Sequence, residues 1–108
     1  MKVVLLSLLL FLSDSAMAET VIVKYRGPVD LKPFTRQSVT RSSLVQRVCY
    51  DKREQYMIIN LSGTYYHYCE IPQNVVSGLL QADSMGRYFN EFIKGQYGCR
   101  LNRVPEYR

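Results

Sequence analysis

Residues 55–71 read QYMIINLSGTYYHYCEI, and the alternation of their side chains predicts two antiparallel strands joined by a tight turn. Ser62 and Gly63 make the two-residue connection, because glycine adopts the positive φ that short hairpin turns require. The turn sets the register of the two strands. It places Leu61 opposite Thr64, Ile59 opposite Tyr66 and Met57 opposite Tyr68.

A third strand is expected just before this hairpin. Residues 42–51 are predicted to form it, and residues 51–54 make a polar turn into the hairpin. Val45 and Val48 are three positions apart, which breaks strict alternation and predicts a β-bulge near residues 46–47. The central element is therefore a three-stranded antiparallel β-meander.

Two short helices are expected after the sheet. Pro72 suits a first helical position, Asp83 or Ser84 can cap the second helix, and Gly95 is a plausible end. Apolar residues recur at helical spacing, namely Val75, Val76, Leu79 and Leu80, followed by Met85, Tyr88, Phe89, Phe92 and Ile93. Both helices need an apolar surface to cover, and one face of the meander supplies it.

The predicted fold class is α+β, with the two short helices packed on one face of the meander. That face carries Met57, Ile59, Leu61, Tyr66 and Tyr68. The other face is more polar and is expected to be open or only partly covered; it carries Tyr56, Ile58, Asn60, Tyr65, His67 and Cys69. Residues 19–41 precede the sheet as an extended N-terminal arm.

The three cysteines allow one disulfide bond and one free thiol. Taking residues 51–54 as the turn puts Cys49 beside Tyr56, so Cys49 and Cys69 lie on the outer strands about 9 to 10 Å apart. Bridged Cα atoms are separated by at most about 7 Å, so Cys99 takes part in any bridge. We favour Cys69 as its partner, which leaves Cys49 free, and Cys49–Cys99 is the alternative.

Positive charge is concentrated in the N-terminal half. The net charge is +5, and the stretch from Glu19 to Arg53 holds eight basic and three acidic residues. Such a stretch can attract an anionic partner, or it can protect an edge strand from further pairing. The candidate binding residues are Arg36, Arg41, Arg47, Lys52, Arg53, Tyr65 and His67.

No catalytic or metal-binding set is recognised. His67 is the single histidine, and no acidic residue is expected beside it to orient it as a base. The cysteines lack the close pairing of a zinc site. We therefore expect neither an enzyme nor a cofactor.

The first eighteen residues predict a secretory signal peptide, with Lys2, an apolar run, and Ala16-Met17-Ala18 ahead of Glu19. The apolar run has roughly ten residues, whereas a membrane-spanning helix needs about twenty. The expected product lies in the periplasm or outside the cell, without a membrane span.

Several separated motifs resemble the KTSC domain, a family named for its occurrence at the C-terminus of some lysyl-tRNA synthetases. They are Ser42-Ser43, Tyr50-Asp51, Tyr66-His67-Tyr68, Ile71-Pro72, Ser84-x-Gly86-x-Tyr88-Phe89-Asn90 and Ile93-Lys94-Gly95. The resemblance implies a KTSC-like domain over residues 42–99, between the arm and a C-terminal tail at residues 100–108. It suggests RNA binding at most and brings no catalytic residue. In exported members of the family a fourth cysteine is expected after the Pro33-Phe34 pair. This chain continues with Thr35-Arg36, so if Arg36 takes the place of that cysteine, the fourth partner is absent.

The predicted function is that of a small exported KTSC-like module that binds or supports a partner without catalysis. The partner would be a protein or an envelope polyanion. The alternative is a polyanion or nucleic-acid binder that uses the basic N-terminal half, although export disfavours nucleic acid.

Overall fold

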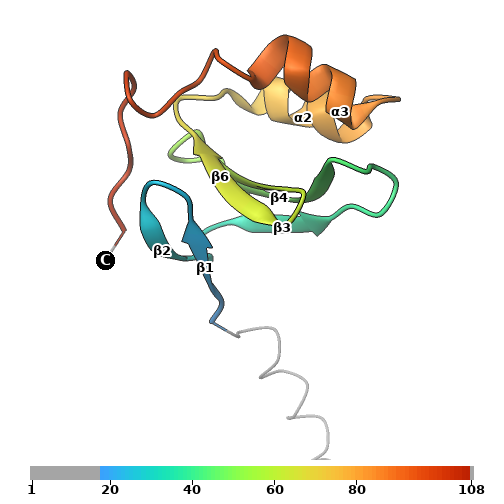
Figure 1. Ribbon diagram of the computed structural model, residues 1–108. Helices are drawn as coiled ribbons and strands as arrows, with labels where there is room; N and C mark the ends of the chain where they lie inside the picture. The colour runs from blue at the N-terminus through green and yellow to red at the C-terminus, as the bar shows by residue number, and fades with distance from the viewer. Residues whose placement is uncertain (1–17, 108) are drawn as a thin grey trace, which may run out of the picture.

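The computed structural model describes residues 18–107, so the predicted leader lies outside the described residues apart from Ala18. The fold is α+β, with helices above one face of a curled, mixed sheet in the order β2-β1-β6-β5-β4-β3 (Figure 1). The strands are β1 (Thr20–Val23), β2 (Gly27–Asp30), β3 (Thr35–Ser38), β4 (Val45–Asp51), β5 (Tyr56–Leu61) and β6 (Thr64–Tyr68). The helices are α2 (Gln73–Gln81), α3 (Met85–Tyr88) and the π-helix η1 (Phe89–Ile93).

The meander of β4, β5 and β6 forms the centre of the sheet. The β5–β6 pairing has the register predicted from the turn, with Ile59 opposite Tyr66 and Met57 opposite Tyr68. The bulge in β4 is also present, between Val45 and Arg47. A two-residue turn leaves no freedom in register, so the local sequence was sufficient here.

The β4–β5 register differs from the prediction by two residues, because Asp51 belongs to the strand and pairs with Tyr56. The carboxylate of Asp51 accepts hydrogen bonds from the backbone N–H groups of Arg53, at 3.1 Å, and Glu54, at 3.4 Å. Gln55 completes the turn with a positive φ of 52°. A shift of two residues keeps each side chain on its predicted face.

The sheet has six strands and not the three that were predicted, because residues predicted to be an extended arm belong to it. The arm residues form β1, β2 and β3: β1 and β2 make a hairpin, β3 pairs with β4, and β1 runs parallel to β6 through Val23 and Tyr65. The inward-facing residues Val21, Val29 and Leu31 are buried. Packing against the second face of the meander removes these side chains from water, which an extended arm could not do.

The helices cover the face predicted for them. Their buried residues form a core with Met57 and Ile59, and Tyr66 and Tyr68 pack at its margin. Ser84 caps α3 by accepting a hydrogen bond from the Arg87 backbone N–H.

The helices differ from prediction in two details. Pro72 is the N-cap of α2, with extended backbone angles, and does not lie in the first turn. Phe92 is 50% exposed. The wider π-helical turn, closed by the bond from Lys94 N–H to Phe89 O, changes the helical phase, so Phe89 and Ile93 are the buried residues of this turn.

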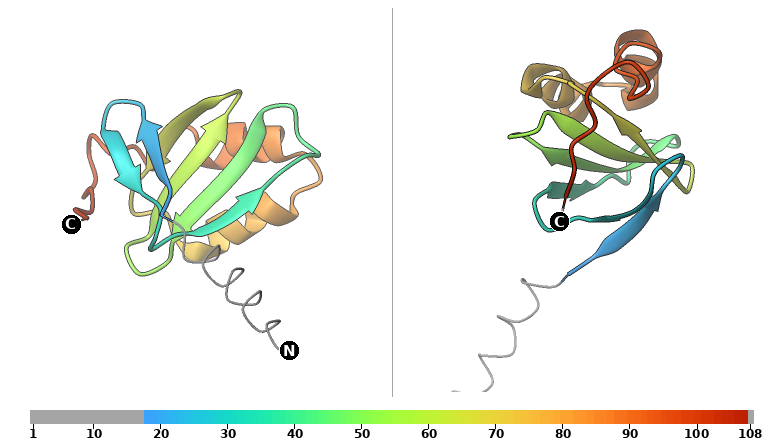
Figure 2. Two further views of the ribbon diagram at one scale, coloured as in Figure 1. Left: turned by 90° about the horizontal axis from the view of Figure 1, so that it is seen from below. Right: turned by 90° about the vertical axis from the view of Figure 1, so that its left-hand side faces the viewer.

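The face predicted to be open or only partly covered is not open: Tyr56, Ile58 and Cys69 are buried on it. The other three residues of this face, Asn60, Tyr65 and His67, stay partly exposed. The core on this face contains Val23, Phe34, Cys49, Tyr56 and Ile58, with Tyr107 packed against it. The β1–β2 hairpin lies along this side of the sheet, and residues 94–107, called the C-terminal segment below, run from the helix layer past the sheet to this side (Figure 2).

A disulfide bond and several hydrogen bonds fix the C-terminal segment. Cys69 and Cys99 are bonded, with an S–S distance of 2.12 Å and a Cα–Cα distance of 5.0 Å, and Cys49 is free and buried. This pairing supports the favoured prediction. Further along, Tyr107 donates a 2.8 Å hydrogen bond to Asp51. Over residues 18–107, none of the helices has both the length and the apolar character needed to span a bilayer.

Candidate functional site

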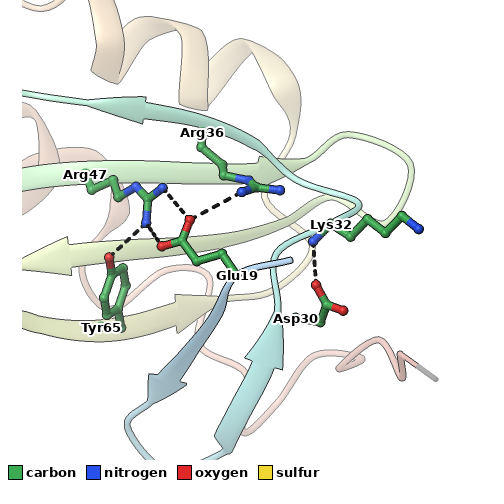
Figure 3. Close-up of polar contacts among 6 residues, drawn as sticks. All are labelled: Glu19, Asp30, Lys32, Arg36, Arg47 and Tyr65. Atoms are coloured by element: carbon green, nitrogen blue, oxygen red, sulfur yellow. Dashed lines mark hydrogen bonds and ion pairs between the residues drawn. The ribbon is translucent and has the colours of Figure 1, made fainter. Parts of the chain in front are cut away.

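Three of the predicted binding residues gather around Glu19, at the start of β1 (Figure 3). Arg47 binds both carboxylate oxygens of Glu19, and its Nη1 donates to Tyr65 Oη at 3.2 Å. Arg36 donates to Glu19 Oε1 at 3.3 Å. The hydrogen bond from Arg47 is the main cause of a lowered Glu19 pKa. We call these four residues the Glu19 cluster; its arginines are already paired within the chain.

The other basic residues of the predicted set lie elsewhere. Arg41 donates to the carbonyl oxygens of Leu80, at 3.0 Å, and Asp83, at 3.4 Å, near the C-terminal end of α2. Lys52 and Arg53 are exposed in the β4–β5 turn. The structure therefore divides the predicted basic set among three places.

His67, the last predicted residue, belongs to a hydrogen-bonded chain on the second face of the sheet. Its Nδ1 lies 2.7 Å from Tyr56 Oη, which accepts a 2.9 Å hydrogen bond from Arg26 Nη1. The Arg26 guanidinium lies over the Tyr56 ring, 5.3 Å from its centroid. Burial, assisted by the charge of Arg26, lowers the pKa of His67, which favours the neutral imidazole.

One edge of β6 is left open beside His67. Lys24 N–H bonds to Tyr65 O at one end of this edge, and Cys69 N–H bonds to Tyr97 O at the other, both at 2.8 Å. Because antiparallel residues alternate between bonded and unbonded pairs, the N–H and C=O of His67 point away from β5 toward this edge.

The open edge lies in a cleft of about 820 Å³, within the range typical of small-ligand sites. Its walls come from the β1–β2 turn, β6 and the C-terminal segment. The lining residues are Lys24, Tyr25, Arg26, Tyr66, His67, Tyr68, Gly98, Cys99, Arg100 and Val104. This set includes three basic residues and no aspartate or glutamate, so the cleft should attract anions.

The aromatic side of the cleft is partly exposed. Tyr25 is 87% exposed and has a positive φ of 70°, which is unusual for a residue with a large side chain. The Nζ atom of Lys24 lies 5.4 Å from the Tyr25 ring centroid and 5.7 Å from that of Tyr66. The cleft therefore combines exposed positive charge with flat apolar surface.

Sequence reasoning missed this cleft and identified only His67 of its lining. Lys24, Tyr66 and Arg100 are far apart in sequence, so no local spacing indicates that they meet. One signal was available: the Cys69–Cys99 bond places Arg100 next to the end of β6. Among residues 18–107, no group of three or more histidine, cysteine or acidic residues is arranged to hold a metal ion.

Comparison with known proteins identifies the central part of the chain, since the family model of the KTSC domain matches residues 41–97. The chain belongs to the KTSC domain family. It is similar in structure to a KTSC domain protein from Yersinia pestis, with a TM-score of 0.56 and 29% identity over 60% of this chain and 92% of that one. The α+β KTSC fold expected from the motifs is thus confirmed.

Two similar sequences show how far the likeness extends. An uncharacterized protein of Stutzerimonas stutzeri is 40% identical over 58 residues, which is 53% of this chain and 82% of that protein. A lysine–tRNA ligase of Nostoc punctiforme is 34% identical over 91 residues, which is 83% of this chain but 14% of the ligase. The longer match exceeds the 57 residues of the KTSC region, so it includes flanking sequence.

The KTSC region supplies only part of the cleft. Tyr66, His67 and Tyr68 lie inside residues 41–97, whereas Lys24, Arg26 and Arg100 lie outside them. The positive charge of the cleft is therefore contributed by the segments that flank the KTSC region.

Proposed function

We propose that this protein is an exported, non-catalytic module that binds an anionic ligand in the cleft beside β6. The observation that carries the proposal is the lining itself, which has Lys24, Arg26 and Arg100 without an acidic residue. Arg26 is held in place, because it donates to Tyr56 Oη at 2.9 Å and to Pro105 O at 2.8 Å. Lys24 and Arg100 are exposed and can move to meet a ligand.

The proposal that the protein is not an enzyme is supported by the surroundings of His67. Its Nδ1 is occupied by the phenol of Tyr56, and the charge that acts on the imidazole is the positive charge of Arg26. Acid–base catalysis by histidine normally uses a partner that orients the ring and stabilises its charged form. Arg26 does the opposite here, because its charge disfavours protonation of the ring.

Binding is tested by calorimetric titration of the oxidised protein with phenyl phosphate and with heparin. The paired substitution Lys24→Gln/Arg100→Gln should weaken binding by at least about tenfold, since each lost charge-assisted hydrogen bond is worth roughly 1.5 kcal/mol or more. The matched control, Lys52→Gln/Arg53→Gln, removes the same charge from an exposed turn. It should leave the affinity for phenyl phosphate unchanged.

The Lys52→Gln/Arg53→Gln variant also distinguishes binding in the cleft from the alternative function, binding of a polyanion by the basic N-terminal half. If the basic N-terminal half binds a polyanion, heparin affinity should fall in the Lys52→Gln/Arg53→Gln variant and depend steeply on salt, whereas the cleft variant should bind like the wild type. Nucleic acid can replace heparin in the same titration. Absence of saturable binding by any of these anions would contradict both functions.

Export is tested on the protein made in a bacterial host with its leader. The expected product is found in the periplasm or medium, begins at Glu19, and has the mass of a chain with one disulfide bond. A cytoplasmic product that keeps residues 1–18 would contradict export while leaving the binding test valid.

A further inference from the structure

Two buried neighbours select one tautomer of His67. Arg26 has no acceptor atoms, so it must donate its hydrogen bond to Tyr56 Oη. Tyr56 is fully buried, and within the described residues its hydroxyl has one other hydrogen-bond partner, His67 Nδ1. The hydroxyl proton is therefore directed at Nδ1, because any other direction would leave a buried donor unpaired. The neutral ring then carries its proton on Nε2.

The Nε2 atom is the ring nitrogen left for the cleft. His67 lines the cleft, and its only hydrogen bond within the described chain is made by Nδ1. In the part of the chain that the structure describes, every buried side-chain nitrogen or oxygen has a partner, so Nε2 must be open to solvent. The backbone N–H of His67 is turned toward the same open edge of β6.

We infer that this cleft recognises an oxyanion, the phosphate, sulfate or carboxylate of its ligand, through Nε2–H of His67 together with Lys24 and Arg100. The inference rests on the proposed function and assigns the ligand's chemical class and the residue that orients it. Lys24 and Arg100 balance the charge of the oxyanion. The N–H of His67, held by the chain of Arg26 and Tyr56, provides a hydrogen bond whose direction is fixed before the ligand arrives.

The chain has one histidine, which gives a direct spectroscopic test. Long-range ¹H–¹⁵N NMR spectra of the oxidised protein near pH 7.5 should show the Nε2–H tautomer of His67. Tyr56→Phe should lower the Nε2–H population, because Nδ1 loses its hydrogen-bond donor. Addition of phenyl phosphate should shift the Nε2 resonance along a saturable curve. Inorganic phosphate, sulfate and benzoate, titrated separately, distinguish the three oxyanions and the contribution of an attached ring.

Two substitutions separate hydrogen bonding from packing. His67→Leu has similar bulk but no donor and should weaken phenyl phosphate binding about tenfold, the loss expected for one hydrogen bond to a charged group. His67→Gln keeps an N–H donor and should bind within about threefold of the wild type. Amide spectra of each variant report whether the sheet is intact.

The outcomes distinguish this inference from the proposed function. If phenyl phosphate binds and Lys24→Gln/Arg100→Gln weakens it, but Nε2 does not shift and His67→Leu binds normally, the role of His67 is wrong and the anion-binding cleft stands. If no oxyanion binds, the proposed function fails. An Nδ1–H tautomer in the free protein would contradict the hydrogen-bonded chain itself.

Discussion

The thiol of Cys49 lies in the core beneath the β1–β2 hairpin, and burial raises its pKa to about 11. Only the thiolate reacts readily with disulfide reagents, so Cys49 should be inert in the folded protein at pH 8. A colorimetric thiol assay should detect almost no thiol in the native protein and one per chain after unfolding. Cys49→Ser should give none in either state. Rapid labelling of the native protein would show that Cys49 is accessible.

His67 should make stability depend on pH. Burial and the charge of Arg26 lower its folded pKa below the usual value of 6.5. The unfolded chain therefore binds more protons than the folded protein as the pH falls from 6.5 toward the folded pKa. The stabilisation that depends on neutral His67 is fully present above pH 6.5. It is lost as the pH falls from 6.5 through the folded pKa.

Urea unfolding of the wild type and of His67→Gln at pH 7.5 and 5.5 measures this effect. The wild type should lose more unfolding free energy on acidification than the variant, which cannot titrate at this position. The comparison cancels the titration of carboxylates common to both proteins. An equal loss in the two proteins would show that His67 has the same pKa folded and unfolded.

At the scale of elements, Gly78 of α2 packs directly against Tyr88 of α3. A Cβ atom added at Gly78 would lie 2.3 Å from Tyr88 Oη, and this hydroxyl also donates a 3.0 Å hydrogen bond to Val75 O. Gly78→Ala should therefore destabilise the protein by about 1 to 3 kcal/mol through overpacking, although alanine alone favours a helix by about 1 kcal/mol. Chemical unfolding measures the difference.

A double-mutant cycle isolates the contact between the two helices. In a Tyr88→Ala background the space beside Gly78 is empty, so Gly78→Ala should become neutral or stabilising by up to about 1 kcal/mol. If Gly78→Ala lowers the unfolding free energy equally in both backgrounds, the destabilisation arises within α2 and not from contact with Tyr88. Gly86→Ala is a useful comparison, because its added Cβ would meet Leu44 at an ordinary 3.7 Å.

The elements that could be predicted are those fixed by local chemistry. The Ser62–Gly63 turn determined the β5–β6 register, and the cap at Ser84 marked the start of α3. The predicted β4–β5 register is two residues off, because the Asp51 side chain bonds to the turn while its backbone stays in the strand, and residue spacing does not show this. The parallel pairing of β1 with β6 joins residues 42 positions apart, Val23 and Tyr65, so no local periodicity could indicate it.

The whole molecule brings together residues that the sequence separates. The cleft needs the β1–β2 turn, β6 and the C-terminal segment at once, and the last of these is held there by the Cys69–Cys99 bond. The predicted binding residues were chosen mainly from the basic N-terminal half of the sequence. Folding instead pairs Arg36 and Arg47 with Glu19 and leaves Lys24 and Arg100 beside an open edge.

The Glu19 cluster links the β1 end of the curled sheet to strands β3 and β4 at its other end. In the strand order, β1 and β3 lie on opposite sides of β6, β5 and β4, yet Glu19 ahead of β1 binds Arg36 on β3 and Arg47 on β4 (Figure 3). Glu19→Gln should lower the unfolding free energy by about 1 kcal/mol, the upper part of the range for partly exposed ion pairs. The loss should be smaller in high salt, which screens the charges.

Asp30→Asn is the matched control, because it removes one negative charge from the same hairpin. The Asp30 carboxylate accepts a 2.9 Å hydrogen bond from the Lys32 backbone N–H. The Glu19 pKa is lowered by Arg47, so the stabilisation should be present above pH 4.5 and lost as the pH falls through the folded pKa. Removal of a leader after Ala18 would keep Glu19, whereas a chain beginning at Thr20 should be destabilised like Glu19→Gln. Equal effects of the Glu19 and Asp30 substitutions in chemical unfolding would show that general charge, and not this cluster, holds the hairpin to the sheet.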